Sequence, residues 1–267
     1  MATTPRYALV TGGGSGIGAL LAEALAERGL QVLCCGRRAA PSELELKPRS
    51  NIAYISADIG TAEGRRDLVS ALPDDAALAV LVQNAAVGDP SPLGQVPLEH
   101  WRYALEVNVT APLFLTQALL PHLQRADGRV LHLGTGVAHR PQQGTAVYGV
   151  TKAAFHRLYQ QLNADLRGAG SQVSVGSISP GVVDTAGVRE HIEAARRHTL
   201  PHVAWFDETY RTRDLSDPLA LASFCMRLLF DVPMDTYTKV EWSFRNPEHR
   251  ALVGAAASKQ HDERSHL

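Results

Sequence analysis

The chain has 267 residues, of which 45% are hydrophobic and 20% charged, so it can bury a full core as one large domain or two small ones. A formal net charge of −1 with scattered arginines argues against nucleic acid or an anionic membrane as a partner. No apolar run reaches the length of a membrane span, and the N-terminal residues leave no room for a cleavable signal. Three cysteines make no disulfide framework, so we expect a reducing, cytoplasmic compartment.

Apolar strand-like runs alternate with helical patterns along most of the chain. The expected strands are 7–11, 31–36, 52–57, 78–83, 129–134, 172–178 and 238–244. The expected helices are 18–28, 63–72, 99–123, 145–167 and 218–230. Nearly continuous apolar strands in strand–helix alternation indicate a parallel sheet with helices on both faces. We therefore predict a single α/β domain over residues 1–254, a Rossmann-type doubly wound sheet, followed by a flexible tail at 255–267.

The first expected strand runs into a glycine-rich turn, TGGGSGIG, at residues 11–18. Gly12, Gly16 and Gly18 permit tight backbone turns, and they let main-chain N–H groups and a helix N-terminus approach a pyrophosphate. A glycine-rich turn alone could be an ordinary loop. Its position between the first strand and the first helix favours a dinucleotide site.

The end of the second expected strand indicates which dinucleotide binds. An NAD site needs an acidic residue there to bond the ribose 2′-hydroxyl, but no acid lies between Glu27 and Glu43. The strand ends in CCGRR, and Arg37 and Arg38 can neutralise a 2′-phosphate. We predict that the site binds NADP(H). The alternative is that Arg37 and Arg38 are solvated turn residues. The adjacent Cys34 and Cys35 are expected to be filler in a buried strand.

Tyr148 and Lys152 stand four residues apart in an expected helix, so their side chains share one face. A free tyrosine has a pKa of about 10, and a nearby cation lowers it by stabilising the phenolate. Such a tyrosine can give a proton to a carbonyl oxygen or take one from an alcohol. Alone, the Y-x-x-x-K pattern fits any amphipathic helix; with the upstream glycine turn, it indicates catalysis.

With these features the chain resembles the short-chain dehydrogenase/reductase family over roughly residues 5–245. The N-A-A sequence at 84–86 matches the family's N-A-G motif, and Asp58 follows the third strand where the family holds adenine. The residues after the sixth strand match the part of the family that contacts the nicotinamide. The resemblance implies a cofactor site made of Gly12, Ser15, Gly16, Ile17, Gly18, Arg37, Arg38, Asp58, Ile59, Asn84, Ala85, Tyr148, Lys152, Pro180, Gly181, Val183 and Thr185.

The same resemblance implies a catalytic tetrad of Asn, Ser, Tyr and Lys. Thirteen residues before Tyr148 stands Thr135, which supplies the serine's hydroxyl with an added methyl. Tyr148 would be the general acid/base, Lys152 its pKa tuner and a ribose ligand, and Thr135 the group that orients the substrate oxygen. Asn108 would hold a water for proton relay.

The sequence departs from the family at three places. Ala86 replaces a glycine near the cofactor, Thr135 replaces the serine, and the C-terminal part reads TKVEWSFRNPEH in place of a D-G-G pattern. That ending resembles the sepiapterin- and benzil-reductase-like branches more than the acyl-carrier-protein reductases.

Residues 186–217 show no clear strand pattern and are expected to form a substrate-binding loop region. Their aromatics, Trp205, Phe206 and Tyr210, suggest a partly apolar substrate or packing beneath the loop. We predict no metal site: Pro201 interrupts any helix that would align His191, His198 and His202, which are expected to be solvated. Two other histidines stand outside this group. His132 fits a buried core position, and His139, with Arg140, could touch substrate.

The sequence as a whole predicts an NADPH-dependent oxidoreductase that reduces a ketone or aldehyde to an alcohol. The alternative is a non-catalytic NADP(H) sensor or scaffold on the same fold. Catalytic turnover of a carbonyl substrate would distinguish the enzyme from the sensor. The expected partners are a small carbonyl or alcohol substrate and further copies of the chain, as a homodimer or homotetramer.

Overall fold

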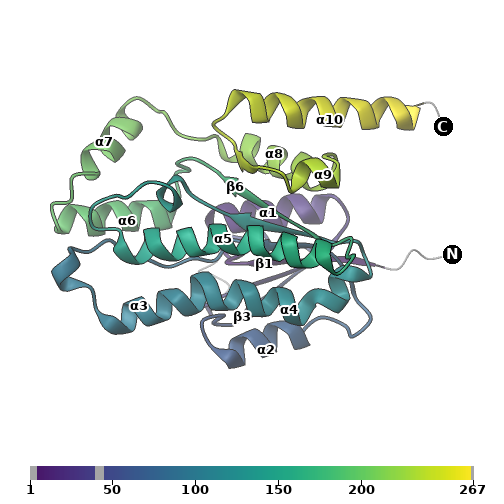
Figure 1. The fold of residues 1–267 in the computed structure, drawn as a ribbon, viewed down its shortest axis with the longest axis horizontal. Helices are drawn as coiled ribbons and strands as arrows, with labels where there is room; N and C mark the ends of the chain where they lie inside the picture. Colours follow the sequence, from purple (N-terminus) through teal and green to yellow (C-terminus); the bar gives the residue numbers. More distant parts are fainter. Residues whose placement is uncertain (1–4, 40–44, 266–267) are drawn as a thin grey trace.

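Seven parallel strands form the centre of the molecule (Figure 1). The computed structural model describes residues 5–39 and 45–265, with side chains up to residue 256. The strands are β1 (Arg6–Thr11), β2 (Gln31–Gly36), β3 (Ile52–Ser56), β4 (Ala77–Gln83), β5 (Arg129–Leu133), β6 (Ser174–Ser179) and β7 (Glu241–Ser243). They pair in the order β3-β2-β1-β4-β5-β6-β7, every pair parallel. The predicted doubly wound sheet is confirmed, and its order reverses between β1 and β4, where such sheets bind ligands.

Helices cover both faces of the sheet (Figure 1). One face is covered by α2 (Ala62–Ser70), α4 (Ala111–Gln124) and α5 (Ala146–Gly168), the other by α1 (Gly16–Glu27) and α8 (Pro218–Phe230). The adjacent cysteines show the two-sided burial: Cys34 packs in the core beneath α1 and α8, and Cys35 in the core beneath α2 and α4. Their expected role as buried filler is confirmed.

The expected helix 99–123 is divided in the structure. It consists of α3 (Leu98–Leu105), a π-helical turn at Glu106–Thr110 and α4. The apolar periodicity continues through all three, so the sequence could not show the break. Single π turns inside α-helices frequently mark functional sites, and Asn108 lies in this one.

Residues 186–217 are largely helical, which corrects the expected loop. Two helices, α6 (Ala186–Arg197) and α7 (Val203–Arg211), occupy most of this region. Thr185 caps α6 by accepting a hydrogen bond from Val188 N–H at 3.3 Å, and Ile192, Ala194 and Ala195 are buried. Val188, Ile192 and Ala195 recur at helical spacing with charged residues on the opposite face, a signal of an amphipathic helix that the expectation of a loop missed.

The C-terminal end also differs from expectation. A short helix, α9 (Met234–Tyr237), precedes β7, which is three residues long where seven were expected. Residues 255–265 of the expected flexible tail belong to α10 (Pro247–Ser265), because alanines favour helix although the sequence is polar; residues 266–267 lie outside the described residues. No helix in the described part of the chain is both long and apolar enough to cross a membrane.

Candidate active site

The glycine-rich turn has the backbone that only glycine adopts readily. Gly12 and Gly16 have φ angles of +66° and +54°, in the left-handed region. A Cβ added at Gly12 would lie 2.8 Å from Nδ2 of Asn84, so space as well as conformation requires glycine there. The turn delivers the chain into α1 at the carboxyl end of β1.

The end of β4 holds this turn in place. The Thr11 hydroxyl accepts hydrogen bonds from the N–H groups of Asn84 (3.1 Å) and Ala85 (3.2 Å). The Asn84 side chain donates in return to the carbonyls of Thr11 (3.1 Å) and Gly12 (3.2 Å). Asn84, expected to touch cofactor, therefore shapes the glycine turn. Thr11 was not among the expected site residues, and its position directly before the turn was the available signal.

The N-terminus of α1 already binds an anionic group. The N–H of Gly16 donates to a carboxylate oxygen of Glu45 at 2.7 Å, and Glu45 N–H bonds the Gly14 carbonyl at 2.9 Å. The Ser15 hydroxyl makes no capping bond, and the first turn of α1 has no acidic residue of its own. The positive end of a helix attracts phosphate in the same way. The turn thus fits a dinucleotide pyrophosphate, which would displace Glu45.

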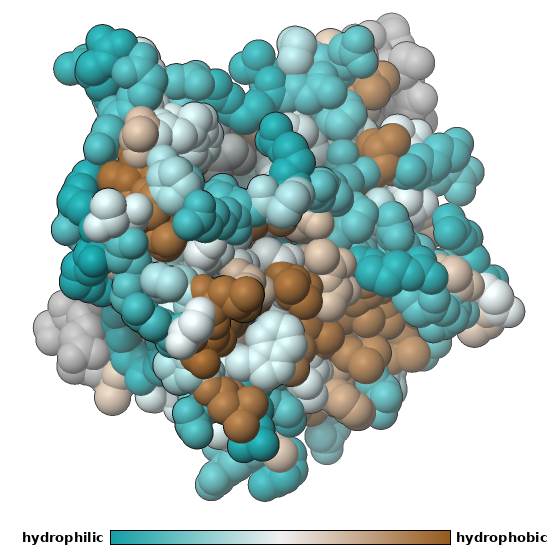
Figure 2. Space-filling view, turned by 60° about the vertical axis from the view of Figure 1, so that its left-hand side comes forward, coloured by the Kyte–Doolittle hydropathy of each residue, from teal (hydrophilic) through white to brown (hydrophobic). Residues whose placement is uncertain are grey.

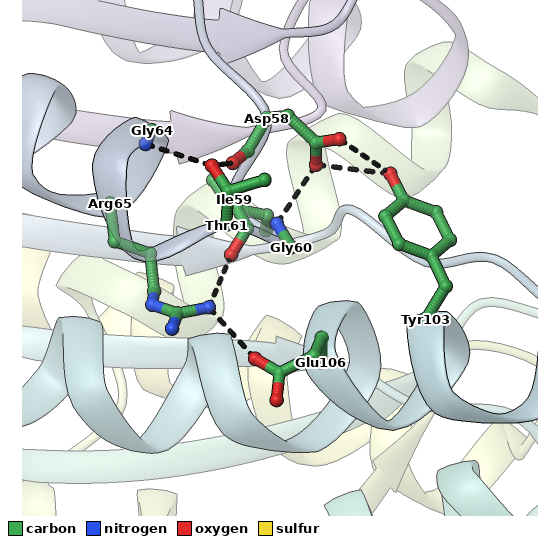
Figure 3. Close-up of polar contacts among 8 residues, drawn as sticks. All are labelled: Asp58, Ile59, Gly60, Thr61, Gly64, Arg65, Tyr103 and Glu106. Carbon is green, nitrogen blue, oxygen red and sulfur yellow. Dashed lines mark hydrogen bonds and ion pairs between the residues drawn. The ribbon is translucent and has the colours of Figure 1, made fainter. Parts of the chain in front are cut away.

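Arg37 lies beside Tyr103 at the end of β2. Its guanidinium carbon is 5.8 Å from the Tyr103 ring centroid, and a guanidinium nitrogen donates to the Tyr103 hydroxyl at 3.4 Å. That hydroxyl donates to the Asp58 carboxylate at 3.0 Å (Figure 3). Burial, and then the bond to Asp58, raise the pKa of Tyr103. Sequence reasoning missed Tyr103, which comes from α3 and bridges the two residues expected at the adenine end.

The loop after β3 is fixed by its own polar contacts (Figure 3). Gly60 N–H donates to the Asp58 carboxylate at 2.9 Å, and Thr61 caps α2 through Gly64 N–H at 3.0 Å. Arg65 donates to the Ile59 carbonyl at 2.8 Å and pairs with Glu106 at 3.2 Å. Asp58 and Ile59 are therefore held rigidly, with the Ile59 side chain buried.

Tyr148 and Lys152 occupy the first two turns of α5. Lys152 is 3% exposed, donates to the Leu133 carbonyl at 2.8 Å, and has its pKa lowered by burial to about 8. Its Nζ is 5.9 Å from the Tyr148 ring centroid. Burial raises the pKa of Tyr148 to about 12. This differs from the expectation that Lys152 lowers it, because desolvation of the buried phenol acts in the opposite direction.

Gly88 supports the Tyr148 side chain, a contact the sequence did not indicate. Its φ is +155°, and a Cβ there would lie 2.7 Å from both Cβ and Cδ2 of Tyr148. The loop after β4 therefore packs directly on the tyrosine. The only available signal was a glycine two residues beyond the N-A-A motif.

Thr135 follows β5, two residues after the Leu133 carbonyl that holds Lys152. Its hydroxyl accepts from Val137 N–H at 3.4 Å and caps a short 3-10 turn, Gly136–Ala138. Thr135 and Lys152 are thus brought to one edge of the sheet, as the resemblance implied.

Asn108 is fully engaged by protein groups. Its Oδ1 accepts from Val87 N–H at 2.9 Å, and its Nδ2 donates to the Val87 carbonyl at 2.6 Å and to the Thr151 hydroxyl at 2.8 Å. The amide has no N–H left for a water, so the side chain positions the loop that carries Gly88. The proton-relay water remains an expectation.

The loop after β6 lies against the glycine turn. A Cβ added at Gly16 would be 3.2 Å from Cγ2 of Thr185. Gly181 has a φ of +75°, Val183 is buried, and the Ser216 hydroxyl holds the Pro180 carbonyl at 2.7 Å. Residues 180–185 therefore border the site opposite the loop after β4.

Aromatic side chains from α6 and α7 approach Tyr148. The ring of His191 is 6.3 Å from that of Tyr148, 5.5 Å from His202 and 5.8 Å from Phe206. Burial lowers the pKa of His191 to about 4, so its ring is neutral. The expectation that His191 and His202 are solvated is wrong, because His191 lies against Tyr148 of α5 and His202 is buried against His191 and Phe206.

Comparisons with known proteins agree with this geometry. A family model described as short chain dehydrogenase matches residues 6–196. A rhamnolipids biosynthesis 3-oxoacyl-(acyl-carrier-protein) reductase from Pseudomonas aeruginosa is 35% identical over 187 residues, covering 66% of this chain and 72% of that protein. A serine 3-dehydrogenase from Rhizobium radiobacter is 36% identical over 180 residues, with the same coverage. The solved RhlG/NADP active-site complex of Pseudomonas aeruginosa has 28% identity and a TM-score of 0.71, covering 92% of this chain and 97% of that one.

Proposed function

Since the chain belongs to the short-chain dehydrogenase family, we propose that it uses NADPH to reduce a ketone or aldehyde to an alcohol. The observation that carries the proposal is the pair on α5: a buried Lys152 one turn after Tyr148, at the edge where Thr135 follows β5. Oxidoreductase chemistry follows from the family. The cofactor, the direction and the roles of individual residues are the proposal.

NADP(H) would lie over the glycine turn, and when bound it supplies the hydride that reaches the carbonyl carbon. Gly16 N–H, which now bonds Glu45, supports phosphate binding at the start of α1. Arg37 and Arg38, with no acid at the end of β2, support a 2′-phosphate. A solved relative holding NADP adds to this preference.

Tyr148 would donate the proton to the substrate oxygen. With its pKa raised to about 12 by burial, the phenol is protonated at neutral pH and can donate its proton to the substrate oxygen. Thr135 would donate a hydrogen bond to the same oxygen, and Lys152 would keep a positive charge behind the tyrosine up to a pH of about 8.

The aromatic surface of α6 and α7 supports a partly apolar substrate. His191, neutral and adjacent to Tyr148, and Phe206 would face it. The two relatives carry names with chemically different substrates, so the resemblance to them leaves the compound open. The resemblance of the C-terminal part to the sepiapterin- and benzil-reductase-like branches remains a prediction.

A homodimer or homotetramer is proposed from exposed apolar side chains. Phe114 on α4 is 48% exposed and Val150 on α5 is 54% exposed. Figure 2, which brings the α3, α6 and α7 end forward, shows apolar side chains gathered in the lower half of that face. Such gathered surface favours a protein partner. The cytoplasmic location remains a prediction.

The test is turnover of NADPH and NADH with a panel of diketones, pteridine-like ketones, aldehydes and ketosteroids. We expect NADPH turnover that falls about 10²–10⁴-fold in Tyr148→Phe and is retained in Tyr7→Phe, a control on β1. Unchanged activity in Tyr148→Phe would refute the mechanism. Tight NADPH binding without turnover across the panel would favour the sensor.

A further inference from the structure

Three side chains with metal-binding atoms meet beside the loop after β5. His139 ends the 3-10 turn that Thr135 begins, His156 lies on α5 one turn after Lys152, and Glu241 opens β7. Nε2 of His139 is 2.5 Å from one Glu241 oxygen, and Nδ1 of His156 is 3.4 Å from the other. One ligand atom from each residue lies within 4.8 Å of the other two.

The set is more than a surface ion pair. Nδ1 of His156 is buried and has no hydrogen-bond partner, although it faces the carboxylate. The His156 and Glu241 side chains are 20% and 18% exposed, and the two histidine rings meet edge to face with centroids 4.4 Å apart. A buried nitrogen without a hydrogen-bond partner is costly, and a cation would satisfy it in the tautomer that has the Nδ1 lone pair.

The surroundings fit a bound cation. The Ser177 hydroxyl lies 3.4 Å from Glu241 and can orient its carboxylate. The Gln160 amide nitrogen is 3.2 Å from Nε2 of His156, and the Gln160 oxygen accepts from Arg157 at 3.4 Å. Rotation of this amide by about 180° would let its oxygen accept the Nε2 N–H when Nδ1 binds a metal. A Cβ at Gly134 would be 2.9 Å from Glu241, so glycine leaves room for the carboxylate. His139 is 41% exposed and provides access.

We propose that His139, His156 and Glu241 bind one divalent transition-metal ion of the Zn²⁺ type. Two imidazoles and a carboxylate suit zinc and its neighbours, whereas Mg²⁺ and Ca²⁺ prefer oxygen ligands alone. The ion would tie the loop after β5, the catalytic helix and β7 together. Its role is structural: it holds the segments that carry Thr135 and Lys152 at fixed separation.

This proposal departs from the expectation of no metal site, which was based on spacing in the sequence. His139 and His156 are followed by Glu241 about a hundred residues later, so no short motif contains the set. The pairing of β7 with β6 brings Glu241 into place.

Cobalt binding tests the site without relying on activity. Full-length protein is treated with chelator, freed of it, and titrated with Co²⁺, whose visible absorption reports nitrogen ligation. We expect one Co²⁺ per chain, displaced by Zn²⁺. At a hundredfold excess of metal over Kd, Tm should rise by about 5–10 °C.

Glu241→Gln keeps the shape and removes the charge, and His139→Gln changes an exposed ligand. Each is expected to weaken Co²⁺ binding at least tenfold, whereas His198→Ala, at the end of α6, should bind as the wild type does. Retained NADPH binding shows that each variant is folded. The proposal would be overturned if the wild type showed no saturable Co²⁺ binding, or if Glu241→Gln bound Co²⁺ as tightly as the wild type. If a variant does not fold, the wild-type titration alone tests the proposal.

Discussion

The part of the chain up to Ala86, which we call the cofactor half after its proposed role, is built differently from the part from Val87 to β7. We call the second part the catalytic half, again after its proposed role. In the first half, the decisive contacts involve backbone: Asn84 bonds the carbonyls of Thr11 and Gly12. In the second half, side chains from distant elements meet, such as Tyr148 with His191. Backbone-shaping sites demand particular residue types and so leave motifs, whereas packed side-chain sites accept many sequences.

The largest effect is expected at the boundary between the halves. Gly88→Ala places a methyl 2.7 Å from two Tyr148 atoms, so the tyrosine or its loop must shift. Because a displacement of about 1 Å can cost 100-fold in rate, we expect kcat to fall roughly 100-fold while NADPH Kd changes little. Steady-state kinetics and fluorescence titration measure the two quantities.

Gly94→Ala is the matched control, because a Cβ there meets nothing within 4 Å. It should retain wild-type kinetics. If Gly88→Ala instead weakened NADPH binding and left kcat intact, Gly88 would belong to the cofactor half, and the division drawn here would be wrong.

Arg37→Ala tests the specificity of the cofactor half. A charged hydrogen bond contributes about 1.5–3 kcal/mol, so its loss should reduce the preference for NADPH over NADH by roughly 10- to 100-fold. The ratio of kcat/KM for the two cofactors is the measurement. Arg66→Ala, an exposed change on α2, should leave that ratio unchanged. A preserved ratio in Arg37→Ala would assign the 2′-phosphate to other groups.

The catalytic half should show its own pH dependence. The lowered pKa of Lys152 means that its charge is present below a pH of about 8 and is lost as pH rises through that value. Reductive kcat/KM should therefore fall to roughly a tenth of its plateau one pH unit above the pKa. In Lys152→Arg the guanidinium stays charged, so whatever activity remains should lack this alkaline decline. The same decline in both proteins would assign it to another group.

The two halves differed in how well the sequence predicted them. The parallel, doubly wound sheet, the glycine turn and the placement of Tyr148 and Lys152 at the sheet edge followed from periodicity, spacing and resemblance. Helices α6 and α7 were not predicted, although α6 has Val188, Ile192 and Ala195 at helical spacing. The contact of Gly88 with Tyr148 was not predicted either, because it joins segments sixty residues apart and depends on loop conformation.

Electrostatics was the other part that the sequence could not predict. The spacing of Tyr148 and Lys152 suggested a tyrosine with a lowered pKa, but desolvation acts in the opposite direction and depends on how deeply α5 packs. Tyr103 was missed for a related reason: its hydroxyl bonds Asp58 only because α3 lies beside the loop after β3.

The smallest predicted effect concerns Glu45, whose carboxylate lies at the start of α1, where a cofactor phosphate would bind. Its carboxylate accepts from Gly16 N–H, and Lys47 beside it bonds Glu23 of α1, so this stretch lies against both the glycine turn and α1. Glu45→Gln keeps the shape but weakens the charged hydrogen bond that a phosphate must displace. NADPH Kd should fall about three- to tenfold, as measured by fluorescence titration.

Glu63→Gln, an exposed change in the first turn of α2, is the control and should leave Kd unchanged. If Glu45→Gln bound NADPH no more tightly than the wild type, the carboxylate would not compete with the cofactor. Tighter binding with kcat preserved would show that a residue outside the glycine motif sets cofactor affinity. The cofactor half would then share with the catalytic half a dependence on contacts that no short motif reveals.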